Sequence, residues 1–363
     1  MAQPANTSSL DIMANLTEFT DTLPYPVLMK LAGLVALLVL PLVIGYLAFR
    51  GFNHFSGVIQ RRAALGAMSK DLTPGNKILI ASVRGAGGGI ARERIMTAME
   101  EFLPEFNFGS PFYMGAAPIS IESTDFALSR DDFERLSNSF EDSGAHLIIW
   151  GEARQATKST RLCFATPAML KGEKAGGFFT MDLKGSPRDW EQDEFLAIAY
   201  VAGKRLRPGL GRPADFRADR LEPILRSMSR LIEADDIVTG RARTELEDDF
   251  AAGALHVGET LENAEWLQRS VDFRVKALQT LNPVHEPIRW SQAKIDLGRA
   301  MCRLCERKFD PGRLEEAMTH IREGIDNTKS DKRMQLAETG FEALQRAEQM
   351  IADRRRFSIR WSV

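Results

Sequence analysis

The stretch Ala145-His-Leu-Ile-Ile-Trp-Gly-Glu-Ala153 is the clearest β-strand signal in this 363-residue chain. Its apolar run contains isoleucines and a tryptophan, a composition typical of a strand buried within a sheet. A similar run occupies residues 77–83 and ends in the glycine-rich loop 84–89. A helical pattern follows over residues 91–102. These elements predict a sheet whose strands are joined by helices.

The segments around this strand complete a predicted domain over residues 77–206. A second strand is predicted over residues 117–122. Ser129, followed by two acids, is a favourable start for a helix ending near residue 142. Further along, the alternation within residues 160–166 and 177–183 predicts an antiparallel hairpin, and a helix over 193–206 ends the domain. This order of elements predicts a small βαβ-type sheet domain.

After a Pro/Gly-rich linker at residues 207–214, the sequence predicts helices only. The predicted helical domain covers residues 215–356, with a short tail at 357–363. Its helices are predicted over residues 215–235, 241–257, 260–281, 287–307, 311–327 and 331–355. The predicted fold class is therefore α+β followed by all-α, as a multidomain chain.

Part of the helical domain repeats. Leu267-Gln-Arg-Ser270 parallels Leu314-Glu-Glu-Ala317, 47 positions later, and Leu297-Gly298 precedes the second set. This pattern of small and large residues lets one helix nest against its partner, and it resembles tetratricopeptide (TPR) repeats with a long inter-helix loop at 306–312. The resemblance covers residues 241–355, about two and a half repeats. The period of that family is 34, so the number of stacked units stays open.

The resemblance implies a superhelix whose inner groove binds peptides or partner proteins. The residues expected to contact the partner are Lys294, Arg299, Arg303 and His320. The α/β part loosely resembles the small nucleotide-free modules of the TolB amino-terminal or FlgO type, through the strands at 77–83 and 145–153. That likeness concerns the fold and implies no catalytic residues.

Residues 31–49 form an uncharged apolar run between Lys30 and Arg50. At about 1.5 Å per residue, the run is long enough to cross a bilayer core of about 30 Å. The predicted organisation is an acidic tail (1–25), a transmembrane helix (26–50, with Leu31–Phe49 in lipid) and a connector (51–76). Basic residues after the run place the C-terminal domains in the cytoplasm and the N-terminus outside. The predicted location is the bacterial inner membrane, in a single pass. The rival topology places the large part outside the cytoplasm.

Two glycine- or cysteine-containing motifs could carry chemistry. The loop Gly85-Ala-Gly87-Gly88-Gly89 lies where a phosphate loop would lie, and with Arg92 it could bind an anion, but it fits neither the dinucleotide nor the Walker pattern. Cys302-Arg-Leu-Cys305 supplies only two of the four ligands that structural zinc needs, so core packing is the favoured interpretation. Paired acids such as Asp248-Asp249 are explained first by solvation or by helix dipoles.

Composition limits the function further. The net charge of −2 and pI of about 6.3 provide no global basic field for nucleic acid. The sequence predicts no catalytic set, no metal and no cofactor, and it leaves the oligomeric state open. The first hypothesis is a membrane-anchored, non-catalytic adaptor or scaffold that recruits a partner protein through its helical domain. The alternative is a membrane-tethered sensor of a small anion or nucleotide that uses the Gly85–Gly89 loop.

Overall fold

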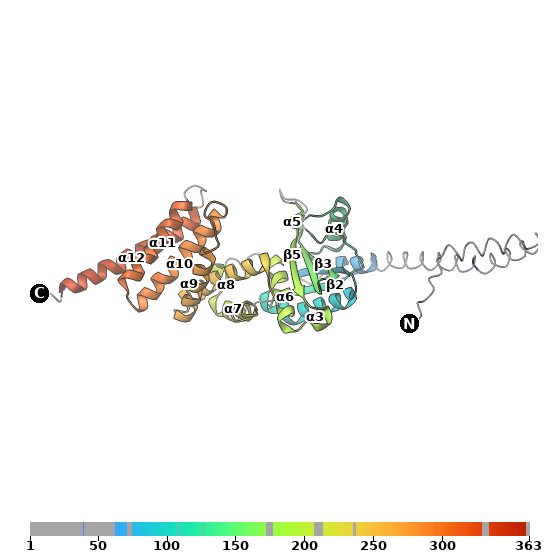
Figure 1. Cartoon of the computed structure of the whole chain (residues 1–363), viewed down its shortest axis with the longest axis horizontal. Helices are drawn as coiled ribbons and strands as arrows, with labels where there is room; N and C mark the ends of the chain where they lie inside the picture. Colours follow the sequence, from blue (N-terminus) through green and yellow to red (C-terminus); the bar gives the residue numbers. More distant parts are fainter. Residues whose placement is uncertain are drawn as a thin grey trace, which may run out of the picture. The chain divides into compact units, whose positions relative to one another are not determined.

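The computed structural model of the chain divides into two compact units, and the described residues fall almost entirely in the second, Ala63–Val363 (Figure 1). Apart from Val39, the structure describes residues 62–70, 75–107, 109–125, 127–171, 177–206, 213–234, 237–328 and 334–360. Side chains are described within these ranges except at residues 334–335 and 355–360.

The predicted transmembrane helix needs correction. Leu31–Phe49 lies outside the described residues except for Val39. Within the described part of the chain, no helix is at once long enough and apolar enough to cross a bilayer. The longest helix there, the 27-residue α12 (Met334–Arg360), carries charged residues along its length. The fold class with a single transmembrane helix is therefore wrong on this finding, and the single-pass inner-membrane location is not retained.

A five-stranded mixed sheet forms the first part of this unit, in the order β2-β1-β3-β4-β5. β1 pairs in parallel with β2 and β3, whereas β4 and β5 continue the sheet as an antiparallel hairpin. The strands predicted over 77–83 and 145–153 are present as β1 and β3. The bounds are β1 (Asn76–Arg84), β2 (Phe112–Ala116), β3 (Leu147–Arg154), β4 (Ser159–Ala165) and β5 (Phe179–Lys184).

The second strand lies earlier in the chain than the sequence predicts. β2 ends at Ala116, and the predicted strand at 117–122 is irregular. Pro118 explains the difference, because proline has no amide hydrogen to donate to a strand ladder. The alternation that suggested a strand reflects burial, since Ile119 and Ile121 are both buried, in the same core as Leu136 and Phe140.

Alternating side chains along the strands bury both faces of the sheet. In β3, Ile149 belongs to the core beneath α3 (Gly88–Phe106) and α6 (Gln192–Leu206), whereas Ile148 and Trp150 belong to the core on the opposite face. The opposite face is covered by α4 (Arg130–Ser143) and by the helix at residues 62–70, whose Met68 is fully buried. The sheet is thus a middle layer between helices, and part of the predicted connector at 51–76 belongs to this fold.

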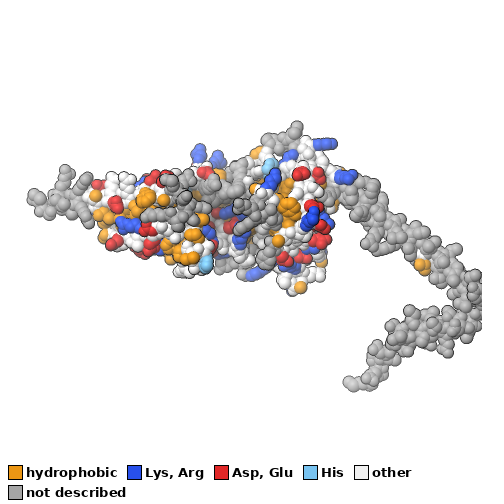
Figure 2. Space-filling view, turned by 90° about the horizontal axis from the view of Figure 1, so that it is seen from above, with side chains coloured by type: hydrophobic (Ala, Val, Ile, Leu, Met, Phe, Trp, Pro, Cys, Tyr) orange, Lys and Arg blue, Asp and Glu red, His pale blue; other side chains and the backbone are white. Residues whose placement is uncertain are grey.

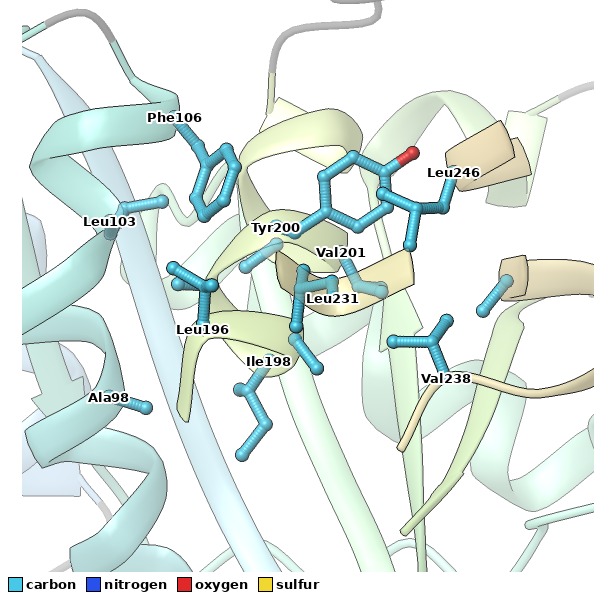
Figure 3. Close-up of a cluster of buried hydrophobic side chains, with 14 of the residues drawn as sticks. Ala98, Leu103, Phe106, Leu196, Ile198, Tyr200, Val201, Leu231, Val238 and Leu246 are labelled. Atoms are coloured by element: carbon cyan, nitrogen blue, oxygen red, sulfur yellow. The ribbon is translucent and has the colours of Figure 1, made fainter. Parts of the chain in front are cut away.

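The core beneath α3 and α6 continues without a break into the first helices of the C-terminal part. Figure 3 shows Tyr200 and Val201 of α6 next to Leu231 of α7 and Leu246 of α8. One hydrophobic core therefore spans the two predicted domains, and most of the predicted linker at 207–214, residues 207–212, lies outside the described residues. The helices are α3 (Gly88–Phe106), α4 (Arg130–Ser143), α5 (Pro167–Lys171), α6 (Gln192–Leu206), α7 (Ala218–Glu233), α8 (Gly240–Thr260), α9 (Ala264–Leu278), α10 (Pro287–Arg307), α11 (Pro311–Thr328) and α12, with short 3-10 turns η1 (Pro187–Asp189) and η3 (Pro213–Asp215).

Candidate functional site

The helices from α8 onward follow a period of 47 residues. α8 begins at Gly240 and α10 at Pro287, 47 positions later, and α12 is described from Met334, a further 47 positions along the chain. α9 begins at Ala264 and α11 at Pro311, with the same offset. The pairs α8/α9 and α10/α11 are therefore successive copies of one helical hairpin, and α12 has the position of the first helix of a third.

Small residues bring the helices of the second hairpin close together. A Cβ atom added to Gly298 of α10 would lie 2.4 Å from Ile321 Cγ1 of α11. A Cβ atom added to Gly324 of α11 would lie 2.7 Å from Ile295 Cγ1 of α10. Only glycine fits at these two positions, so the nesting inferred from Leu297-Gly298 and the following helix is confirmed in geometry.

Charged pairs repeat with the same period. Arg299 lies 2.7 Å from Glu259, and Arg346 lies 3.8 Å from Glu306. Each arginine follows its glutamate by 40 positions, and each member of the second pair follows its counterpart in the first by 47. The first helices of successive hairpins are thus joined by equivalent ion pairs.

Three of these four side chains, Glu259, Arg299 and Arg346, line a groove along α8, α10 and α12, here called the inner groove. One hollow, of about 590 Å³, lies between α8 and α10 and is bounded at one end by Asp215 of η3. A smaller hollow of about 140 Å³ lies between α10 and α12. Glu259 and Arg299 line both hollows, so the two adjoin along the helices.

The two ends of the inner groove differ in charge. The charged side chains of the larger hollow are mainly acidic: Asp215, Asp248, Asp249, Glu259 and Asp296, with Arg274 and Arg299. Those of the smaller hollow are mainly basic: Arg299, Arg303 and Arg346, with Glu259 and Glu342. Acidic and basic side chains are also interspersed over the face drawn in Figure 2, with no large area of one sign.

A buried arginine joins the helices around the larger hollow. Arg274 of α9, with a side chain only 4% exposed, contacts Asp296 Oδ2 of α10 at 2.7 Å and Asp248 of α8 at 3.3 Å. Asp296 is 2% exposed and also accepts a hydrogen bond from Gln292 at 2.8 Å. Charges this deeply buried require partners, so the network fixes how successive hairpins pack.

A second buried carboxylate connects the inner groove to the sheet. Tyr200 of α6 donates a hydrogen bond to Asp249 of α8 at 2.8 Å, and Lys204 forms an ion pair with the same carboxylate. Burial raises the pKa of Asp249 above its ordinary value, although Lys204 and Tyr200 act in the opposite direction. Burial also raises the pKa of Tyr200. The solvation role expected for Asp249 from its sequence is wrong, because this side chain is buried and paired.

The four predicted partner-binding residues divide into two pairs. Arg299 and Arg303 line the inner groove. Lys294 and His320 instead meet between α10 and α11, where Lys294 Nζ lies 3.1 Å from His320 Nδ1 and 2.7 Å from Glu323. Burial, with the neighbouring lysine, lowers the pKa of His320. The structure therefore brings only the arginines into the candidate site.

The predicted anion-binding residues Gly85, Gly87, Gly88, Gly89 and Arg92 lie in the loop after β1 and in the first turn of α3. Close packing accounts for two of these glycines. A Cβ atom at Gly85 would lie 2.2 Å from the carbonyl oxygen of residue 153, and one at Gly88 would lie 1.9 Å from that of residue 83. The space beside Gly89 is open.

The cysteine pair of α10 lies in the core. Cys302 and Cys305 are 2% and 1% exposed and pack with the side chains of α11 and α12. Burial raises the pKa of Cys302 to about 12 and also raises that of Cys305. Within the described ranges, no three His, Cys, Asp or Glu side chains are placed to hold a metal ion. Core packing, the favoured interpretation of this motif, is confirmed by the burial.

The raised thiol pKa leads to a testable prediction. We expect Cys302 and Cys305 to react with iodoacetamide at pH 8 far more slowly than they do in urea, because only the thiolate is nucleophilic and both sulfurs are covered. Mass spectrometry of the alkylated peptides over time measures this. Labelling of either cysteine in the native protein at its rate in urea would contradict the prediction.

Comparison with known proteins gives no relative: the chain matches no family model, no curated protein and no solved structure. The resemblance to tetratricopeptide repeats therefore stays a prediction from sequence, as does the expectation that the chain is not an enzyme.

Several residues of the site escaped sequence reasoning. Asp296 and Glu306 lie 47 positions after Asp249 and Glu259, so aligning the chain with itself at that offset pairs two aspartates and two glutamates. The repeat was detected through its apolar residues alone. At the charged positions, this alignment pairs Asp249 with Asp296, which both line the larger hollow, and Glu259 with Glu306, which each contact an arginine of the next hairpin. Arg274 gave no such signal, because the equivalent position is Ile321.

Proposed function

We propose that the chain binds an extended segment of a partner protein in the inner groove and acts without catalysis. The observation that carries the proposal is the continuity of this groove along α8, α10 and α12, which is lined by the arginines of the two ion pairs, Arg299 and Arg346, 47 positions apart. Repeated helical hairpins commonly use such extended surfaces to bind other proteins.

The charges of the inner groove favour one kind of partner segment. Carboxylates predominate in the hollow nearest η3, and guanidinium groups predominate near α12. A complementary segment carries basic side chains at the first end and acidic side chains at the second. Because Arg299 and Arg303 are 25% and 28% exposed, a bound segment can exchange with their present ion pairs. The acidic hollow disfavours a polyanion such as nucleic acid.

Arg346→Glu tests this proposal, with Arg322→Glu as a matched control. Both arginines are half exposed, at 50% and 51%, and each contacts a glutamate, at 3.8 and 3.9 Å. Arg346 lines the inner groove, whereas Arg322 lies on α11 and does not line it. The two substitutions therefore change charge equally but at different places.

The measurement uses peptides selected from a displayed random library on the full-length chain. Fluorescence anisotropy then gives the affinity of each selected peptide for the two variants. We expect Arg346→Glu to weaken binding about tenfold, equivalent to about 1.4 kcal/mol, and Arg322→Glu to leave it unchanged. The proposal fails if no peptide is enriched, or if the two variants bind the selected peptides equally.

A further inference from the structure

A cavity of about 390 Å³ opens at the end of the sheet, well apart in sequence from the inner groove. Three segments bound it: Ala86 of the loop after β1, the hairpin between β3 and β4, and the turn around Ser186 that leads from β5 into η1. It lies at the carboxyl ends of the neighbouring strands β1 and β3. From β1 the chain continues to β2 and from β3 to β4, and these two strands lie on opposite sides of the β1/β3 pair. Ligands of open α/β sheets bind at such a position. It is called the edge cavity below.

A buried hydroxyl without a partner lines the edge cavity. Thr160 of β4 is fully buried, and its side chain lies on the same face of the strand as Leu162, toward α3 and α6. Its Oγ1 atom has no hydrogen-bond partner among the described residues. Buried hydroxyls are almost always paired, because an unpaired one loses its hydration without compensation. This oxygen is therefore an unsatisfied polar atom of a residue in the wall of the edge cavity.

The charges around the edge cavity favour an anion. Lys158 lies at the exposed hairpin with a positive φ of 45°, and no carboxylate of the described part of the chain pairs with its ammonium group. Arg154 adds a second positive charge, although it is engaged by Asp125 and Glu152. Among the residues that line the cavity, only Asp189 is acidic.

The adjoining helix adds to this preference. α3 begins beside Ala86, and its N-cap Gly87 provides no side-chain hydrogen bond. No acidic residue lies in its first turn. Neither the N-cap nor the first turn of α3 thus supplies a side chain that compensates the positive end of the helix dipole, a condition under which an anion is stabilised.

We propose that the edge cavity binds a small phosphorylated molecule. The phosphate contacts the Thr160 hydroxyl and the Lys158 ammonium group, and the positive end of α3 stabilises its charge. Phosphate suits these groups because its oxygens accept several hydrogen bonds from different directions. The volume is within the range of pockets for small molecules. This proposal is independent of partner binding in the inner groove.

Thermal unfolding of the full-length chain tests the proposal, with pyrophosphate, glucose 6-phosphate and ATP as probes. Sodium chloride at equal ionic strength is the control for a general salt effect. We expect at least one phosphate probe to raise the unfolding midpoint by about 2 °C or more, and chloride to leave it unchanged. Equal midpoints with all probes, or an equal rise with chloride, would overturn the proposal.

Two variants locate the effect. Thr160→Val keeps the shape of the side chain but removes the hydroxyl, and Lys158→Gln removes the charge. We expect each to reduce the affinity for the effective probe about tenfold or more by isothermal titration calorimetry. Thr157→Val is the control, because Thr157 belongs to the same hairpin but its hydroxyl pairs with Ser159 and it does not line the cavity. Unchanged affinity in both Thr160→Val and Lys158→Gln would refute the assignment.

The ligand-free protein provides a separate measurement. Because Thr160→Val removes an unpaired buried hydroxyl, we expect its unfolding midpoint without ligand to equal or exceed that of the original chain. A lower midpoint would show that the hydroxyl already has a partner, and the argument from its burial would fail.

Discussion

Replacing Arg274 by methionine is expected to lower the free energy of unfolding by about 3–5 kcal/mol, since it leaves the carboxylate of Asp296 buried without its main counter-charge. Asp296 is 2% exposed, and its contact with Arg274 is 2.7 Å. Its other cationic neighbour, Arg299, lies farther away, at 3.7 Å. Asp248 on the other side retains Arg289 at 2.8 Å, so the cost falls mainly on Asp296.

Urea denaturation followed by circular dichroism at 222 nm measures this effect. Lys276→Met is the matched control on the same helix: Lys276 is 60% exposed and pairs with Glu247, and exposed pairs contribute about 0–1 kcal/mol. The double variant Arg274→Met with Asp296→Leu removes both charges, so we expect it to recover most of the lost stability. If Arg274→Met lowers the free energy of unfolding no more than Lys276→Met does, the buried network does not stabilise the packing of α8, α9 and α10.

The sequence correctly predicted the elements that depend on interactions between residues close together in the chain. Ser129 was expected to begin a helix. Its hydroxyl accepts a hydrogen bond from the amide of Asp132, which lies in the first turn of α4. The alternation around β4 and β5 likewise produced the expected hairpin. A helix cap and a strand alternation depend on neighbours a few positions away, so one sequence suffices to find them.

Contacts between distant residues were not predictable in the same way. By its position Asp132 is an ordinary first-turn acid, yet its carboxylate also accepts hydrogen bonds from the amides of Glu122 and Ser123 and so fixes a preceding loop. Nothing near Asp249 in the sequence indicates that Tyr200 and Lys204 of α6 pair with it. Such roles depend on how helices pack, which periodicity does not specify.

The same limit applies to the candidate site, of which the sequence indicated only a part. Periodicity placed Arg299 and Arg303 on a repeat helix, and both line the inner groove. The same reasoning placed Lys294 and His320 in the groove, where they do not lie. Helical spacing orders residues around one helix, but which face meets the neighbouring hairpin is decided by close contacts such as those at Gly298 and Gly324.

Replacing Gly85 by alanine is expected to lower the free energy of unfolding by about 2–5 kcal/mol, because two costs add. Gly85 has a φ of +85°, a conformation that costs a residue with a Cβ atom about 1–2 kcal/mol. The new Cβ atom would also lie 2.2 Å from the carbonyl oxygen of Ala153 in β3, and that backbone atom cannot move without disturbing the sheet.

Gly89→Ala, four residues later, is the matched control. We expect it to raise the free energy of unfolding, whereas Gly85→Ala lowers it. Nothing lies within 4 Å of the Cβ position of Gly89, and alanine is favoured over glycine within a helix by about 0.5–1 kcal/mol. Urea denaturation of both variants measures the difference. Equal effects of the two substitutions would mean that close packing against β3 does not explain the glycine at 85. A loss confined to Gly85→Ala would show that this glycine is required by the turn from β1 into α3, whatever the edge cavity beside it binds.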